Sequence, residues 1–395
     1  MTAPALSSAL HLRPRCRLGA ASPGGLALPD AHPSATTLYA PRGVFLDLDP
    51  AAAEPSGRIV VVDSGNHRVL LWNRLPGAGA DGEPADVVLG QPDFTTEGAR
   101  AAGRGPEAGF HLPTAALIVD GTLLVADAWH HRIAGWTTVP TASGTPPDFV
   151  LGQPDPRAIE PNRGGPVDAH TLYWPYGLAW IDGLLWVADT GNRRVLGWHG
   201  LPREDRPADL VLGQPSFRDN AENRGGPLGA DSFRWPHALA GGAGGFYVAD
   251  AGNHRVLGWR ETPRADRPAD FALGQTGLAV GFESQYAPQS ATTLRFPYGA
   301  AVCDDRLAVA DTANNRILLW PEPPTATAAP AGLVLGQESF QGNGENRWKA
   351  VAADTFCWPY GIAWNGGLLA VADSGNNRVM IWEEEHHVSR RTRPH

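Results

Sequence analysis

The sequence predicts an all-β fold, a six-bladed β-propeller whose four-stranded blades close into a ring. Three observations predict it. One stretch of twelve residues occurs six times, and its aspartate recurs every 61 to 64 residues. In every copy an arginine stands five places after the aspartate and a tryptophan nine places after it. The chain also contains 47 glycines and 36 prolines, which favour short strands and turns over long helices.

The charged and aromatic residues that recur in every copy are interpreted as structural. Their even distribution indicates that they hold each blade together, through a turn cap, a charge-assisted contact and packing. The aspartates are Asp63, Asp127, Asp189, Asp250, Asp311 and Asp373; the arginines are Arg68, Arg132, Arg194, Arg255, Arg316 and Arg378; the tryptophans are Trp72, Trp136, Trp198, Trp259, Trp320 and Trp382.

Each repeat is expected to form four strands, the innermost of which begins at a proline that we call the lead proline. Proline is tolerated at the first residue of a strand, and the small residues after it allow close approach near an axis. The second strand ends at the repeated aspartate, 14 residues later in repeats two to six and 22 in repeat one. Asp-x-Gly-Asn then predicts a turn in which Gly and Asn tolerate positive φ. The lead prolines are Pro41, Pro113, Pro175, Pro236, Pro297 and Pro359.

The fourth strand is a Leu-Gly-Gln element, of which only five copies follow the six hairpins. Arg17-Leu18-Gly19 stands 22 residues before Pro41, close to the offset of 23 in the other copies. We therefore predict that the N-terminal segment supplies the outer strand of the last blade and removes the open edges of the ring. The predicted single domain is 1–382, with blades at 41–91, 113–153, 175–214, 236–275, 297–337 and 359–382 plus 15–20; residues 383–395 are predicted to be a charged, disordered tail.

Composition argues against several classes of partner and location. The net charge of −9 and the pI near 5.8 disfavour a nucleic-acid or anionic-membrane surface. No apolar run reaches the roughly 18 residues of a membrane helix, and the N-terminus lacks the apolar core of a secretory signal. The cysteines Cys16, Cys303 and Cys357 are scattered without metal-type spacing. A reduced, cytoplasmic location is the expectation.

The repeat Val-Ala-Asp-x-Gly-Asn-x-Arg-Val, preceded by Pro-x-Gly, resembles the NHL repeat, and six copies over about residues 20–382 resemble a six-bladed NHL β-propeller. The added Leu-Gly-Gln-Pro-Asp-Phe element is similar to that of bacterial NHL repeat-containing proteins. The resemblance implies radial sheets around a central channel, with the Asp turns and the long loops on one face, where ligands usually bind.

Among NHL propellers, the peptidyl-hydroxyglycine amidating lyases are similar in overall plan and carry zinc on histidines that follow the lead proline in alternate blades. Here those positions hold Thr114, His237 and Tyr360, so the three-histidine zinc pattern is absent. No cofactor is predicted, although a divalent metal stays an option. A different site formed by Cys357 with His111 or His170 is a further alternative.

The residue after the lead proline differs from repeat to repeat, and the six side chains should ring one mouth of the channel. One interpretation is a hydrogen-bonded plug that rigidifies the channel. The other is a site for a small polar or anionic ligand, with Arg42 as an anion clamp and His237 as acid or base. The predicted catalytic residues are Arg42, Tyr176, His237, Tyr298 and Tyr360, and Thr114 is predicted to bind ligand.

Other candidate ligand-binding residues lie in the turns and loops. Repeat two has Trp129-His130 where other repeats have Gly-Asn or Ala-Asn, which predicts either a contact role or a differently shaped turn with an exposed aromatic. Arg163 and Arg224 belong to repeated loop motifs and could form loop structure or an anion-attracting rim. His170 is a polar outlier five residues before its lead proline.

Two classes of function follow. The first is a binding module whose loop-bearing face and channel mouth take a small polar or anionic ligand, a peptide or a protein. The second is a lyase or hydrolase that acts on a small polar or anionic substrate through Arg42, His237 and the channel tyrosines. Nucleic acid and membrane are not expected partners. Propellers serve both classes, so the site and not the fold must decide.

Overall fold

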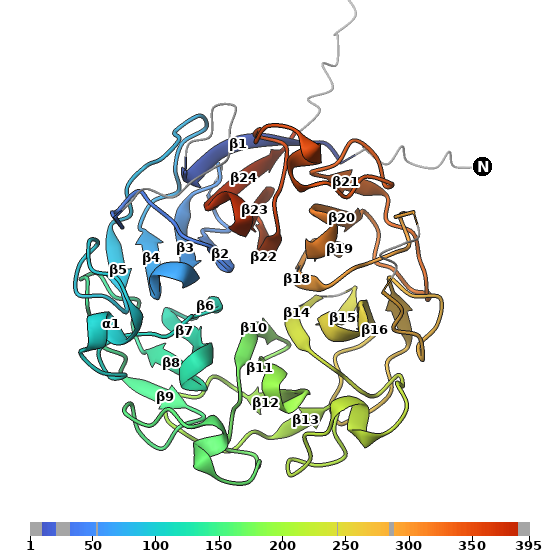
Figure 1. Cartoon of the computed structure of the whole chain (residues 1–395), viewed down its shortest axis with the longest axis horizontal. Coiled ribbons are helices and arrows are strands. Elements are labelled where there is room, and N and C mark those ends of the chain that lie inside the picture. The colour runs from blue at the N-terminus through green and yellow to red at the C-terminus, as the bar shows by residue number, and fades with distance from the viewer. Residues whose placement is uncertain (1–9, 21–31, 53, 243, 284–287, 386–395) are drawn as a thin grey trace, which may run out of the picture.

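The computed structural model describes residues 10–20, 32–52, 54–242, 244–283 and 288–385. Six four-stranded antiparallel sheets stand around a common axis, which confirms the predicted six-bladed β-propeller (Figure 1). In each sheet the innermost strand is followed outward by the next strands in chain order, except in the sheet that joins the two ends of the described chain. No helix in the described part of the chain is long and apolar enough to cross a membrane.

The first three blades contain twelve strands. They are β2 (Gly43–Leu48), β3 (Gly57–Asp63), β4 (Arg68–Trp72) and β5 (Val87–Leu89); β6 (Ala115–Val119), β7 (Thr122–Asp127), β8 (Arg132–Trp136) and β9 (Phe149–Leu151); and β10 (Pro175–Ile181), β11 (Leu184–Asp189), β12 (Arg194–His199) and β13 (Leu210–Leu212).

The last three blades contain the other twelve strands of the described chain. They are β14 (Pro236–Gly242), β15 (Gly245–Asp250), β16 (Arg255–Trp259) and β17 (Phe271–Leu273); β18 (Pro297–Cys303), β19 (Arg306–Asp311), β20 (Arg316–Trp320) and β21 (Leu333–Leu335); and β22 (Pro359–Asn365), β23 (Leu368–Asp373), β24 (Arg378–Glu384) and β1 (Leu12–Gly19).

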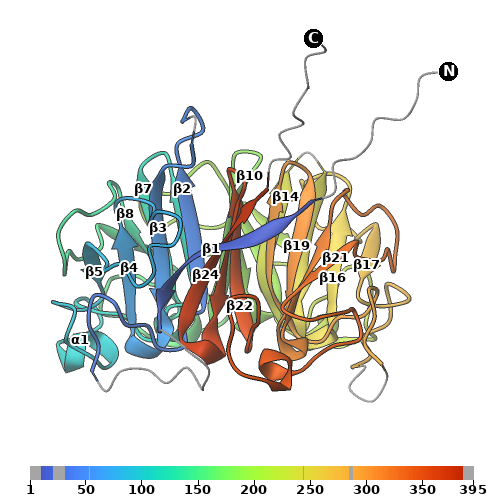
Figure 2. The same cartoon turned by 90° about the horizontal axis from the view of Figure 1, so that it is seen from above.

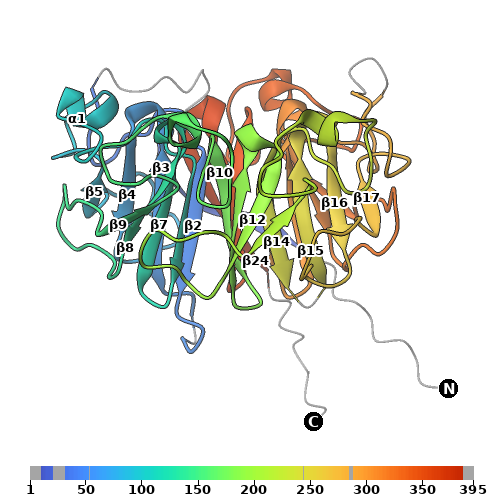
Figure 3. The same cartoon turned by 90° about the horizontal axis from the view of Figure 1, so that it is seen from below.

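The helical segments are short, and Figures 2 and 3 show their ribbons on one face of the ring. A 3₁₀ turn follows the second strand of every blade. Three more 3₁₀ turns lie in long loops between blades, and another of these loops contains the α-helical turn α1 (Ala99–Gly103). The hairpin turns are η1 (Ser64–Asn66), η2 (Ala128–His130), η4 (Thr190–Asn192), η6 (Ala251–Asn253), η7 (Thr312–Asn314) and η9 (Ser374–Asn376); the loop turns are η3 (Pro161–Gly164), η5 (Glu222–Gly225) and η8 (Glu345–Trp348).

The ring closes through β1, as the offset of Arg17-Leu18-Gly19 predicted. β1 pairs with β24 from Leu12 opposite Glu384 to Gly19 opposite Arg378, and its eight residues exceed the three of the outer strands in the other blades. Cys16 and Leu18 are buried in the adjoining core. The strand β24 continues to Glu384, so the tail does not begin at residue 383 as predicted; residues 386–395 lie outside the described residues.

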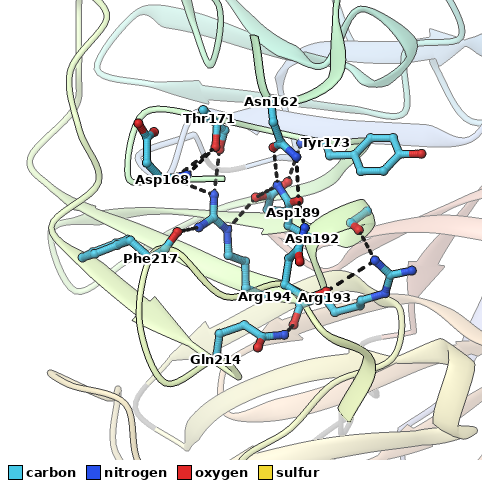
Figure 4. Close-up of polar contacts among 12 residues, drawn as sticks. Asn162, Asp168, Thr171, Tyr173, Asp189, Asn192, Arg193, Arg194, Gln214 and Phe217 are labelled. Carbon is cyan, nitrogen blue, oxygen red and sulfur yellow. Dashed lines mark hydrogen bonds and ion pairs between the residues drawn. The ribbon is translucent and has the colours of Figure 1, made fainter. Parts of the chain in front are cut away.

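The repeated aspartate and arginine form a fully buried pair at the base of each hairpin, shown for the third blade in Figure 4. Arg194 donates to Oδ2 of Asp189 at 2.7 Å and to the loop carbonyls of Phe217 and Thr171. The other carboxylate oxygen of Asp189 accepts the backbone N–H of Tyr173 at 2.7 Å. Because one ion pair on the hairpin satisfies backbone groups of both long loops, it holds these segments on the same face.

The repeated tryptophan anchors the proline-rich link between the third and fourth strands. Its indole N–H donates to a carbonyl of that link in five blades, for example from Trp72 to Glu83 at 2.9 Å. After Trp382 the described chain has no such link, and the buried indole nitrogen has no hydrogen-bond partner among the described residues. In the last blade Trp382 therefore contributes packing without this hydrogen bond.

The residue after the repeated Asn forms a contact between neighbouring blades that we call the blade clasp. Its side chain accepts a hydrogen bond from the backbone N–H of the residue before the next lead proline. The donors and acceptors are Leu112 to His67 (3.0 Å), Trp174 to His131 (3.2 Å), Phe296 to His254 (3.3 Å), Trp358 to Asn315 (2.8 Å) and Ala40 to Asn377 (2.9 Å).

The blade clasp is replaced between the third and fourth blades, where the acceptor position holds Arg193, whose guanidinium can only donate. The amide of Trp235 turns instead to Oδ1 of Asp250 at 3.3 Å. The five residues that donate a backbone N–H to the blade clasp all have positive φ, between 46° and 51°, whereas Trp235 does not. The clasp therefore stabilises a backbone conformation that bulky residues rarely adopt.

The hairpin turn corrects one expectation about repeat two. Positive φ belongs to the residue after the Asn, such as His131 at 54°, and not to the preceding Gly position, so Trp129 meets no backbone penalty there. In the third blade glycine at that position provides space, because a Cβ on Gly191 would lie 2.5 Å from Cγ of Tyr173. The turn at Trp129 keeps the common 3₁₀ shape.

Candidate functional site at the channel mouth

The six innermost strands enclose a cavity of about 360 Å³ that runs along the axis. Small and aliphatic side chains such as Val44, Ala179 and Leu239 form its wall, and Trp180 and Trp364 also line it. The residues that follow the lead prolines form its polar part, on the face that carries the hairpin turns. The structure thus brings together the six predicted residues: Arg42, Thr114, Tyr176, His237, Tyr298 and Tyr360.

Four aromatic rings of this set lie in contact, in the order of their blades. The ring centroids of Tyr176 and His237 are 4.4 Å apart, those of His237 and Tyr298 4.5 Å, and those of Tyr298 and Tyr360 4.9 Å. Arg42 completes the set, because its guanidinium lies 4.9 Å from the centroid of Tyr360 and donates to the hydroxyl of Tyr176 at 3.2 Å. We call these five residues the mouth ring.

The mouth ring carries positive charge without a counter-charge. Arg42 is the only Lys or Arg in the cavity lining, and no Asp or Glu of the described chain lines the cavity. Arg42 also forms no ion pair with any described carboxylate. A half-buried guanidinium without a carboxylate partner favours an anion from outside the chain, since planar guanidinium groups bind carboxylate and phosphate well.

His237 is held as a neutral imidazole. Its Nδ1 lies 3.0 Å from the carbonyl oxygen of Trp235, which requires a proton on Nδ1 and leaves Nε2 as an acceptor. The residue is half-buried and borders the cavity; desolvation by the surrounding protein lowers its pKa to about 4, with Arg42 adding to the effect. At neutral pH His237 is therefore an acceptor and a weak base.

The phenols of Tyr298 and Tyr360 are also neutral. Desolvation raises the pKa of both Tyr298 and Tyr360. Neither hydroxyl has a hydrogen-bond partner within the described residues, and neither is among the oxygens that are buried without a partner. Both are therefore available to a ligand in the cavity. Thr114 is different, because its hydroxyl already donates to the carbonyls of Pro175 and Tyr176 and so joins two blades.

The predicted loop arginines do not line the cavity, and both are paired. Arg163 binds both oxygens of Asp205 at 2.6 and 2.7 Å, and His170 lies 3.5 Å from the same carboxylate. Arg224 binds Asp231 and Asp266 at 2.5 and 2.9 Å. These pairs neutralise the arginine rim that the sequence suggested.

Trp129 and His130 also lie outside the cavity lining. His130 is completely buried, with Nδ1 2.7 Å from Asp127, where it replaces the Asn of the other turns. Its ring belongs to a cluster with His111, at 5.8 Å between centroids, and His111 lies 5.5 Å from Trp129. Trp129 is 42% exposed.

The structure does not bring Cys357 and the histidines together as a metal site. Cys357 lies against the turn of the last blade, near Gly375, and burial raises the pKa of its thiol to about 12. Within the described residues no group of three or more His, Cys, Asp or Glu side chains is placed to hold a metal ion.

A row of aromatic residues, three of them exposed, lies beside the mouth ring, and sequence reasoning singled out only Trp129 among them. The residue before the lead proline is aromatic in the last four blades, two places before a mouth-ring residue in each case. The ring of Phe296 is 6.3 Å from that of Tyr298 and 6.4 Å from that of Trp235, with which it stacks. With Trp129, these residues form what we call the aromatic collar: Trp129, Trp174, Trp235, Phe296 and Trp358.

No family model and no curated protein sequence matches the chain. Among solved structures, virginiamycin B lyase from Staphylococcus aureus is 12% identical, with 95% of this chain and 99% of that chain covered and a TM-score of 0.41.

Two other solved structures are similarly distant. A structural genomics protein of unknown function from Bacteroides thetaiotaomicron is 14% identical over 95% of this chain and 76% of that chain, with a TM-score of 0.49. The WD40 β-propeller domain of Doa1 is 10% identical over 92% and 97%, with a TM-score of 0.43. At these scores the similarities carry no information on function.

Proposed function

We propose that this chain is a ligand-binding propeller of NHL type that holds a small anionic ligand at the channel mouth. The observation that carries the proposal is Arg42, a half-buried guanidinium on the mouth of a cavity whose described lining contains no carboxylate. The ligand's anionic group would pair with Arg42, and its polar atoms would bind the hydroxyls of Tyr298 and Tyr360 and Nε2 of His237.

The alternative function, a lyase or hydrolase, is less well supported by the same geometry. His237 is oriented by a backbone carbonyl, and its low pKa makes it a weak general base at neutral pH. The mouth ring contains no carboxylate that could orient or assist it. A neutral acceptor beside an unpaired guanidinium suits recognition of a ligand better than proton abstraction.

The proposal is tested by thermal shift and calorimetric titration with acetate, citrate, gluconate and phosphate at pH 7.5 and constant ionic strength. We expect at least one anion to bind to the natural protein and Arg42→Gln to lose most of that affinity. Arg74→Gln, which removes the same charge from an exposed residue outside the cavity lining, should bind as the natural protein does. Equal binding by the Arg42→Gln and Arg74→Gln variants would overturn the proposal.

A further inference from the structure

We infer that the ligand at the channel mouth is an acidic oligosaccharide, whose carboxylate pairs with Arg42 and whose sugar rings stack on the aromatic collar. The inference rests on the proposed function and specifies its ligand. Three features of the face carry it: the distribution of the exposed aromatic side chains, the free hydroxyl groups of Tyr298 and Tyr360, and the strained backbone at three collar residues.

Three exposed aromatic side chains are spread around the opening. Trp129, Trp235 and Trp358 are 42%, 36% and 41% exposed and come from the second, fourth and sixth blades. A set of large exposed aromatics around a cavity marks a binding surface. A ligand with one flat ring would reach only one of these residues, whereas a chain of linked rings can contact several.

The hydrogen-bonding groups match a hydroxyl-rich ligand. The hydroxyls of Tyr298 and Tyr360 can both donate and accept, and Nε2 of His237 accepts. Pyranose rings combine hydroxyl groups at their edges with C–H faces that are apolar, so that one sugar can use the phenols and a tryptophan face together. Arg42 favours a ligand with an anionic group, and a uronic acid has a carboxylate attached directly to its sugar ring.

Three residues of the collar are maintained at a cost in backbone strain. Trp174, Phe296 and Trp358 have φ of 50°, 49° and 51°, a conformation that is rare for bulky residues. Each is held there by the blade clasp, through His131, His254 and Asn315. Trp358 is the exposed one of these three, and strain that the surrounding structure maintains at an exposed position is typical of ligand-binding sites.

The experiment compares four probes by calorimetry at fixed ionic strength: galacturonate, trigalacturonate, neutral maltotriose and triglutamate. We expect trigalacturonate to bind at least about tenfold more tightly than galacturonate, because additional rings contact the collar. Maltotriose should bind weakly because it lacks the anion. Triglutamate should bind no better than galacturonate, because it has charge without sugar rings.

Variants separate the collar from the anion site. Trp358→Ala and Trp129→Ala should each weaken trigalacturonate on the order of tenfold and weaken galacturonate less, and Trp358→Tyr should retain most of the affinity. Trp348→Ala is the matched control, because Trp348 is 78% exposed but outside the collar. Unchanged melting temperatures would show that the variants are folded.

The outcomes distinguish this inference from the proposed function. Suppose that galacturonate binding depends on Arg42, but trigalacturonate binds no more tightly than galacturonate, or triglutamate binds as tightly as trigalacturonate. The assignment of an oligosaccharide is then wrong, and the anion site at Arg42 is retained. The same holds if the collar variants bind trigalacturonate as the natural protein does. If no anion depends on Arg42, the proposed function fails and this inference fails with it.

Discussion

The blade clasp leads us to predict that the stability of the fold depends on the protonation of His131. This residue is buried, and its Nδ1 must be unprotonated to accept the amide N–H of Trp174. Desolvation, with His130 as the next cause, lowers its pKa from 6.5 to about 4. The unfolded chain therefore binds a proton more readily than the folded protein, and His131 contributes stability that is lost as the pH falls from about 6.5 to about 4.

The magnitude follows from the same shift. A difference of about 2.5 pKa units corresponds to at most about 3.4 kcal/mol, and by pH 5.0 about 2 kcal/mol of this is lost. His131→Asn should remove that loss, because Asn is the acceptor that the fifth and sixth blades use at Asn315 and Asn377. Asn also tolerates the φ of 54° at this position.

The assay is urea unfolding of the natural protein and of His131→Asn between pH 7.5 and 5.0. We expect the two proteins to be similar at pH 7.5 and the natural protein to lose about 2 kcal/mol more by pH 5.0. His131→Leu lacks the acceptor and should be destabilised by about 1–3 kcal/mol even at pH 7.5. His199→Asn, at an exposed position, is the control. Identical pH dependence in the natural protein and His131→Asn would refute the reasoning.

Two further predictions concern the architecture. Deletion of residues 1–20 removes β1 and leaves β24 as an open edge, so the protein should aggregate or melt at a clearly lower temperature; an unchanged melting temperature in a calorimetric scan would rule out the closure. Arg194→Leu leaves Asp189 buried without its cation and three loop carbonyls without a donor, and should cost about 3–5 kcal/mol by urea unfolding. A loss no larger than that of the exposed Arg203→Leu would contradict the structural role of the pair.

The fold was predictable because spacing carries the information. The offset between Gly19 and Pro41 predicted the closing strand, and the position after each lead proline predicted which residues meet at the mouth. Both predictions use chain positions that a propeller places at fixed distances from its axis.

The polar contacts of individual side chains were less predictable. Arg163 is paired with Asp205, which stands 42 residues later in the link between β12 and β13, and a motif gives no sign of that pairing. The blade clasp joins residues 42 to 45 positions apart, with one further contact across the ring closure. A signal was present in the sequence, because His or Asn occupies the acceptor position in every repeat except at Arg193.

The account depends on an anion site at Arg42, and anomalous diffraction from a crystal soaked in bromide tests it most directly. We predict a bromide peak within hydrogen-bonding distance of the Arg42 guanidinium, at the mouth ring. Bromide peaks at other arginines with none beside Arg42 would contradict the account.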